Sequence, residues 1–216
     1  MPKATVYRIL STLETRGYLD RDVGGGYRLS EKLFSLQQTV SPAQKLVRIA
    51  PPIMEELADQ CRETVNLGML DGGEVVVIAT AESPQSVRMT SKVGNRRCIH
   101  TTAIGKALLA TLPEASVDRI IGLKGLPQLT PSTITNRKDL ATELRRIRKQ
   151  GFAIDNQENE VEGRCVGMKI EGIGDPAFAL SISGPVFRMD LRRLRALAPD
   201  LRRSCDRIGM AFRSSS

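Results

Sequence analysis

Aromatic residues and histidine are scarce in this 216-residue sequence. Aromatic residues make up 4% of it, tryptophan is absent, and His100 is the single histidine. A hydrophobic core must therefore be mainly aliphatic. One histidine cannot build a histidine-rich metal centre, so we expect no metal. We also expect no other cofactor.

Cysteines are few and far apart. No two of them form a CxxC pair, and their positions are Cys61, Cys98, Cys165 and Cys205. This spacing fits the free thiols of a cytoplasmic protein better than a disulfide framework or a zinc site. We therefore expect a cytoplasmic location.

Long hydrophobic runs are also missing. No apolar run approaches the roughly 20 residues that span a bilayer, and the N-terminus lacks the charged-then-apolar pattern of a signal peptide. We expect no membrane partner. Hydrophobic residues still form 41% of the chain, enough for one substantial core and a small appendage.

Positive charge is in excess, with a net charge of +8, which suits a polyanionic partner. Much of this excess lies near the C-terminus, where residues 188–213 hold eight arginines and three aspartates. Apolar residues in the same segment have helical spacing. We interpret it as a terminal helix with a solvated basic face, and a second DNA-binding surface is the alternative.

Residues 2–33 have the pattern of a helix followed by a short hairpin. Apolar residues recur at the spacing of one buried helix face: Val6, Ile9, Leu10 and Leu13. Gly17 predicts the end of this helix, because glycine adopts positive φ freely. Residues 18–21 and 27–29 then flank three glycines, which is typical of a hairpin with a flexible tip.

A helix followed directly by such a hairpin predicts part of a winged helix-turn-helix in residues 1–30, and therefore DNA contact. The side chains expected to reach phosphates or base edges are Lys3, Thr5, Tyr7 and Arg8 on the helix and Arg21 and Arg28 on the wing. A complete module needs two more helices before Pro2, so we expect the chain to begin within the module. The alternative is a sensing or dimerisation module without DNA binding of its own, because those helices support the recognition helix.

The remaining sequence predicts a linker helix region at residues 31–50 and an α+β domain at residues 51–216. The first linker helix is expected over residues 30–40, with Ser30 as its cap. Strand-like runs occur in adjacent hairpins with helices between them, which favours an antiparallel sheet over a doubly wound parallel one. The expected strands are 64–70, 74–79, 85–92, 152–155, 165–170 and 178–183. The expected helices are 43–50, 53–62, 103–112, 114–121, 138–150 and the basic C-terminal segment.

Several stretches together resemble the IclR family of bacterial transcriptional regulators. They include PKATVYRILSTLETRGYLDRD, GGYRLSEKLF, ETVNLGMLDGGEVV, HTTAIGKALLA, GFAIDNQENE and ALSISGPVFR. The resemblance implies a partial winged helix-turn-helix, a linker helix and a GAF-like effector-binding domain. It also implies a homodimer or homotetramer that binds operator DNA and a small carboxylate or sugar-acid effector.

The resemblance also implies effector-binding positions. They fall on Ala103, Ile104, Asp155, Cys165, Ser181 and Ser183. Serine hydroxyls and the backbone N–H groups at the start of a helix can hold a carboxylate without a full counter-charge. Asp155 could accept a hydrogen bond from a hydroxyl of the ligand. Gly163 stands where the family usually has an aliphatic pocket residue.

Catalysis is not expected. The Gly105-Lys106 pair lacks the other residues of a P-loop. Cys165 with Asp155 and His100 could suggest a nucleophile, but a buried cysteine usually behaves as a small hydrophobic residue, and no local motif places a base beside it. We predict a DNA-binding regulator rather than an enzyme.

Overall fold

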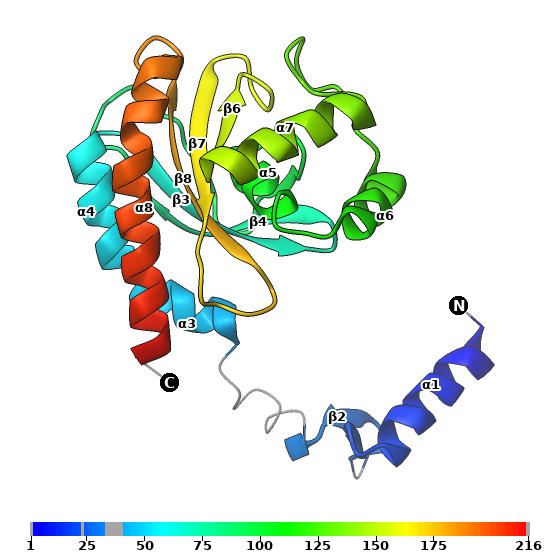
Figure 1. Cartoon of the computed structure of the whole chain (residues 1–216). Coiled ribbons are helices and arrows are strands. Elements are labelled where there is room, and N and C mark those ends of the chain that lie inside the picture. Colours follow the sequence, from blue (N-terminus) through cyan, green and yellow to red (C-terminus); the bar gives the residue numbers. More distant parts are fainter. Residues whose placement is uncertain (1, 23, 33–40, 215–216) are drawn as a thin grey trace. The chain divides into compact units, whose positions relative to one another are not determined.

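The computed structural model describes residues 2–22, 24–32 and 41–214, and its contacts divide the chain into two compact units, Met1–Ser41 and Pro42–Ser216 (Figure 1). The helix expected over residues 30–40 falls largely on residues 33–40, outside the described part. Each unit is described by itself below.

The first unit contains the expected helix and hairpin. Helix α1 (Lys3–Thr15) precedes the antiparallel strands β1 (Leu19–Arg21) and β2 (Tyr27–Leu29). Gly17 has φ +74°, and the Tyr18 N–H donates back to the Leu13 carbonyl at 2.8 Å. This is the backbone geometry with which a glycine ends a helix.

The predicted apolar face of α1 is largely exposed. No residue of α1 is buried, and Val6, Ile9 and Leu13 are 39%, 46% and 37% exposed. The β1–β2 hairpin therefore does not by itself cover this face. Amphipathic helices normally bury such a stripe against a neighbouring element.

The second unit holds a six-stranded sheet in the order β5-β4-β3-β8-β7-β6, with every neighbouring pair antiparallel. Its elements in chain order are α3 (Pro42–Ile49), α4 (Pro51–Cys61), β3 (Thr64–Asp71), β4 (Glu74–Ala81), β5 (Arg96–Cys98), α5 (Ala103–Leu109), α6 (Glu114–Lys124), α7 (Arg137–Gln150), β6 (Ala153–Asn156), β7 (Gly163–Lys169), β8 (Phe178–Pro185) and α8 (Leu191–Ser214). The predicted α+β class with an antiparallel sheet is confirmed.

Local sequence explains where several of these helices begin and end. Pro51 and Pro52 open α4, where their missing N–H groups cost nothing. The Asn136 side chain caps α7 by accepting from the Asp139 N–H at 2.9 Å, and Gly151 at φ +81° ends it.

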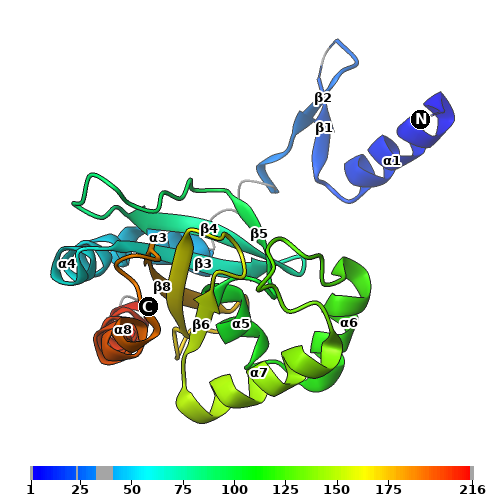
Figure 2. The same ribbon diagram turned by 90° about the horizontal axis from the view of Figure 1, so that it is seen from above.

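The helices cover both faces of the sheet (Figure 2). Helices α4 and α8 pack on one face over an aliphatic core, and α5 and α7 lie on the other with α6 beside them. Strand β8 shows how alternation divides its side chains: Phe178, Leu180 and Ile182 join the first core, whereas Ser181 and Ser183 point to the α5 side. This second face positions the candidate site.

Most predicted elements are confirmed with ends shifted by a few residues, but the strand expected over residues 85–92 is wrong. That segment forms no ladder, and the strand beside β4 is instead β5, which pairs through Glu74↔Cys98. The Met89 carbonyl accepts from the Thr64 hydroxyl at 2.7 Å, so a side chain and not a strand satisfies it. Val87 in this segment is exposed, so no burial favours a strand there.

Candidate functional site

A pocket that is open to solvent lies between the sheet and the start of α5; we call it the sheet–α5 pocket. All six predicted ligand positions line it, although they come from four elements: Ala103 and Ile104 from α5, Asp155 from β6, Cys165 from β7, and Ser181 and Ser183 from β8. The structure therefore brings together residues that are up to 80 positions apart in the sequence.

Polar side chains on β3 and β8 form the floor of the pocket. Asn66 pairs with Ser181 in the strand register, and its amide donates to the Ser183 hydroxyl at 3.3 Å. Thr80 fixes that amide by donating to its oxygen at 3.1 Å. All three floor residues, Asn66, Ser181 and Ser183, are buried, so their hydroxyl and amide groups are shielded from bulk water and available to a ligand.

Asp155 is the buried acid of the pocket. Its Oδ1 accepts from the backbone N–H groups of Glu158 and Asn159 at 2.8 and 3.3 Å. Burial, with a contribution from the Glu158 carboxylate, raises the pKa of Asp155 to about 7, although the two N–H bonds oppose the shift. Near neutral pH this carboxyl group can therefore either donate or accept a hydrogen bond.

Cys165 lies directly opposite Asp155 in the β6–β7 ladder. Burial, and then the charge of Asp155, raise the pKa of its thiol well above the usual value. The thiol therefore stays protonated, which is the opposite of what a cysteine nucleophile requires. His100 does not assist it, because its Nε2 lies 3.1 Å from the Pro127 carbonyl and His100 is not part of the pocket lining.

Glycines let α5 pack closely against the turn before it and against strand β7. A Cβ at Gly105 would lie 2.0 Å from the Ile99 carbonyl oxygen, and one at Gly167 would lie 2.7 Å from the Ala103 carbonyl carbon. Thr102 caps the helix by accepting from the Gly105 N–H at 3.0 Å. These contacts fix Ala103 and Ile104 in the pocket wall.

Gly163 also has a visible role in the wall. It lines the pocket, and a Cβ there would lie 2.8 Å from the Met89 methyl carbon. Met89 comes from the segment after β4 and therefore occupies the space that a larger side chain at position 163 would take. The wall at this point is apolar in spite of the glycine.

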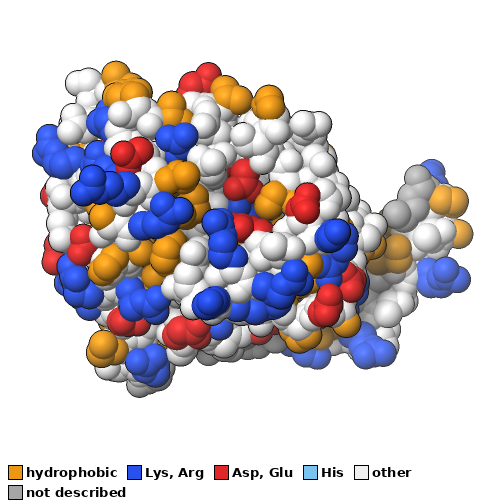
Figure 3. Space-filling view, turned by 45° about the horizontal axis from the view of Figure 1, so that its top comes forward, with side chains coloured by type: hydrophobic (Ala, Val, Ile, Leu, Met, Phe, Trp, Pro, Cys, Tyr) orange, Lys and Arg blue, Asp and Glu red, His pale blue; other side chains and the backbone are white. Residues whose placement is uncertain are grey.

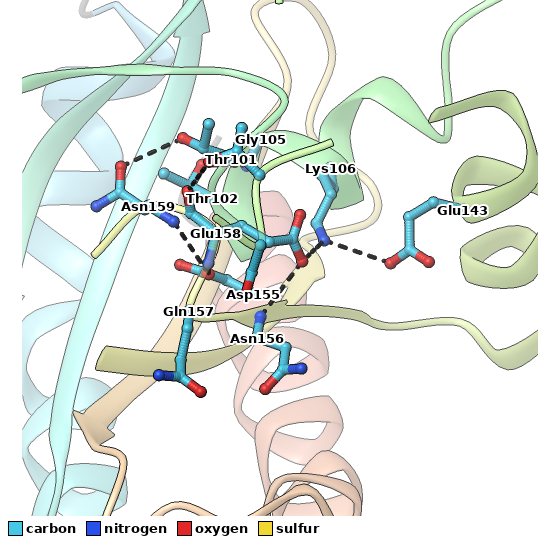
Figure 4. Close-up of polar contacts among 12 residues, drawn as sticks. Thr101, Thr102, Gly105, Lys106, Glu143, Asp155, Asn156, Gln157, Glu158 and Asn159 are labelled. Carbon is cyan, nitrogen blue, oxygen red and sulfur yellow. Dashed lines mark hydrogen bonds and ion pairs between the residues drawn. The ribbon is translucent and has the colours of Figure 1, made fainter. Parts of the chain in front are cut away.

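Lys106 is the centre of a buried ionic cluster behind the pocket (Figure 4). Its ammonium group is fully buried and lies 2.5 Å from Glu158 Oε1 and 3.4 Å from Glu143 Oε1. Glu158 Oε1 also accepts from the Asn156 N–H at 3.3 Å. The cluster connects α5 to α7 through Glu143 and to the turn after β6 through Glu158. Strand β6 itself contains Asp155.

Sequence reasoning missed several lining residues. The polar ones are Asn66, Thr90, Ser91, Asn95, Arg97, Thr102, Asn159 and Glu160. Asn66 had a detectable signal, since it is a lone amide in the apolar strand TVNLGML, in phase with Thr64. Arg97 had none, because it belongs to a three-residue strand that hydrophobic periodicity does not reveal.

The six predicted DNA-contacting residues all lie in the first unit. Lys3, Tyr7 and Arg8 are exposed on α1, and Thr5 is half-buried. On the hairpin, Arg21 pairs with Glu14 at 3.1 Å and Arg28 with Asp20 at 3.7 Å. Both hairpin ion pairs are largely exposed, so a phosphate could replace the acid at little cost.

Basic side chains also gather on the second unit, over α7 and α8 (Figure 3). The predicted terminal helix is confirmed: Leu194, Leu201 and Ile208 are buried, and Arg192 and Arg203 are exposed. Among the described residues, no helix is both long and apolar enough to cross a bilayer. No group of three or more metal-ligating side chains occurs among them either.

Two family descriptions match the chain. The IclR helix-turn-helix domain matches residues 1–23, and the bacterial transcriptional regulator IclR C-terminal domain matches residues 38–210. The transcriptional regulator KdgR of Escherichia coli is 36% identical over 197 residues, which cover 90% of this chain and 75% of KdgR. The similar curated proteins are regulators and repressors rather than enzymes.

Solved structures agree with this assignment. IclR of Thermotoga maritima has a TM-score of 0.74 at 31% identity, covering 98% of this chain and 86% of that one. The inducer-binding domain of PobR from Acinetobacter, solved as a double mutant with 3-hydroxybenzoic acid, has a TM-score of 0.69 at 26% identity. That comparison covers 75% of this chain and 96% of the PobR domain. The chain therefore belongs to the IclR family of bacterial transcriptional regulators.

Proposed function

We propose that the sheet–α5 pocket binds a small organic acid and that this binding changes how the protein engages operator DNA. The observation that carries the proposal is the convergence of buried donors, Asn66, Ser181 and Ser183, on one pocket with apolar walls. Small ligands are commonly oriented in this way, by a few polar groups within an apolar cavity. The aromatic acid bound by the PobR domain supports a ligand of this class.

The acid would bind without a buried counter-charge. Hydroxyl and amide groups of the floor donate to its carboxylate, as do the backbone N–H groups of Ala103 and Ile104 predicted from the sequence. Asp155 complements a hydroxyl or oxo group of the ligand, because its pKa of about 7 lets it act as donor or acceptor.

Operator contact would come from the first unit. Thr5 and Arg8 would contact base edges or phosphates, and Lys3 and Tyr7 would mainly position the helix on the DNA backbone. The hairpin arginines Arg21 and Arg28 would reach flanking phosphates. The protein would act in the cytoplasm, where its operator lies, as a homodimer or homotetramer. A two-fold pair of recognition helices reads two half-sites, and the effector would shift the balance between their arrangements.

A second candidate is an effector-sensing or dimerisation module that does not bind DNA by itself. The exposed apolar face of α1 favours it, since Val6, Ile9 and Leu13 lack a covering element among the described residues. A recognition helix without packing partners is not held in a fixed orientation against the groove.

A thermal-shift screen of the chain with sugar acids, keto acids and aromatic acids tests the ligand. At 100 times its Kd, an acid should stabilise the folded protein by about 2.7 kcal/mol. An operator-binding titration with that acid then separates the two candidates. A changed operator affinity supports the first; no operator binding in the presence of a confirmed ligand supports the second. If no acid stabilises the chain, the proposed function is wrong.

A further inference from the structure

The sheet–α5 pocket contains one basic side chain among the described residues, that of Arg97. It belongs to β5, where side chains alternate between the two sides of the strand. Its neighbour Arg96 is bound elsewhere, to Asp71 and Glu74 at 2.8 Å each. Arg96 therefore has its carboxylate partners within the protein, whereas Arg97 faces the space where a ligand would lie.

Arg97 is poorly satisfied in the free protein. Its single ion pair among the described residues joins Nη2 to Glu160 Oε1 at 3.5 Å, and both side chains are well exposed. The same carboxylate oxygen also accepts from the Asn159 amide at 3.3 Å. A guanidinium has five N–H donors, so most of those on Arg97 are available. An exposed pair of this length contributes little energy, and a better acceptor can replace Glu160.

Arg97 also lies away from the pocket floor. Strand β5 is an edge of the sheet and is three strand positions from β8, which carries Ser181 and Ser183. At about 4.8 Å per strand, their backbones are roughly 14 Å apart along the sheet. The arginine side chain spans part of this distance, and a ligand of a few carbon atoms spans the rest. A carboxylate held by Ser181 and Ser183 on β8 therefore leaves the Arg97 guanidinium available for a second acid group.

We infer that the effector carries two acid groups. This inference rests on the proposed function. The inner carboxylate is held by the floor donors Asn66, Ser181 and Ser183, and the outer one replaces Glu160 as the partner of Arg97. A planar guanidinium matches a carboxylate in a bidentate arrangement, which makes Arg97 the residue that selects a dicarboxylate over a monocarboxylate.

Matched acids test the inference by calorimetric titration of the chain. The pairs are succinate with butyrate, glutarate with pentanoate, adipate with hexanoate, and the three benzenedicarboxylates with benzoate. We expect at least one dicarboxylate to bind about tenfold more tightly than its monocarboxylate partner. R97Q should remove this preference, and R97K should retain part of it. E160Q should tighten dicarboxylate binding, because the competing carboxylate is gone.

R96Q is the matched control, since it removes the same charge from the adjacent position outside the pocket. It should leave the preference unchanged, and urea unfolding checks that each variant is folded. Equal affinity for the two acids of every pair would overturn the inference while leaving the proposed function intact. A preference that persists in folded R97Q would also overturn it. If the wild type binds none of these acids but binds a monocarboxylate found in the screen, the inference is wrong and the proposed function stands; if no acid of either set binds, both fail.

Discussion

Lys106 shows how one residue can couple the pocket to its surroundings. A fully buried ammonium group is costly unless it is paired, and here the carboxylates of Glu158 and Glu143 compensate for it. The second oxygen of Glu158 is buried and has no hydrogen-bond partner among the described residues. The cluster therefore depends on the lysine, because without it two acids would face each other in a poorly solvated space.

Replacing Lys106 with methionine should destabilise the protein by about 3–5 kcal/mol, since it leaves buried charge without a partner. Urea unfolding measures this change. The double variant K106M/E158Q should recover part of the loss, because one of the stranded charges is removed. A stability loss below 1 kcal/mol in K106M would show that the ion pairs are not important to the fold.

Asp155 should make stability depend on pH. Its pKa is about 7 in the folded chain, whereas the ordinary value, expected in the unfolded chain, is 3.8. Between pH 3.8 and pH 7, the folded state therefore holds a proton that the unfolded state has released. The free energy of unfolding therefore falls as the pH rises through this interval, by up to about 1.4 kcal/mol per pH unit from this group. Urea unfolding at pH 5, 6, 7 and 8 measures it.

The variant D155N should lose this contribution, and the difference between its pH profile and that of the wild type isolates Asp155 from other groups. D59N, at an exposed position of α4, is the control and should keep the wild-type profile. A D155N profile as steep as that of the wild type would contradict the raised pKa.

At the scale of elements, hydrophobic periodicity predicted most helices and strands of the second unit, because each buries one face in an aliphatic core. It failed at residues 85–92, which form no strand, and at β5, a three-residue edge strand without a buried side chain. Family motifs predict the pocket positions on α5, β6, β7 and β8. Asn66 has a signal in the sequence as a lone amide in an apolar strand, whereas Arg97 has none, since only the strand order shows that it shares a face with the pocket residues.

The close packing of helix α5 can be tested by substituting Gly105. A methyl group at Gly105 would collide with the Ile99 backbone, so G105A must shift α5 away from the turn that contains Ile99. We expect it to cost more than 2 kcal/mol in urea unfolding and to weaken acid binding. G122A in α6 is the matched control, because nothing lies within 4 Å of its added Cβ; alanine should stabilise that helix by up to about 1 kcal/mol. Equal effects of the two substitutions would contradict the described packing of α5.

At the scale of the whole molecule, positive charge occurs on both units, and only one set is proposed to contact DNA. The log of operator affinity should fall linearly with the log of salt concentration, with a slope of about −0.9 for each phosphate contact. R8A should make this slope shallower by about 0.9, the contribution of one phosphate contact. Fluorescence anisotropy in a salt series measures it.

R192A removes an exposed arginine of α8 and serves as the control. It should leave the salt slope unchanged if the basic face of that helix is merely solvated. A shallower salt slope in R192A would instead support the alternative of a second DNA-binding surface on α8.

The central claim is that buried donors on the floor of the sheet–α5 pocket hold an acid. Calorimetric titration of the chain with an acid identified in the screen tests it most directly, comparing wild type with the S181A/S183A double variant. We predict at least a tenfold loss of affinity in the double variant, with no loss in S116A, a serine of α6 outside the pocket. Unchanged affinity in a folded S181A/S183A protein would contradict the account.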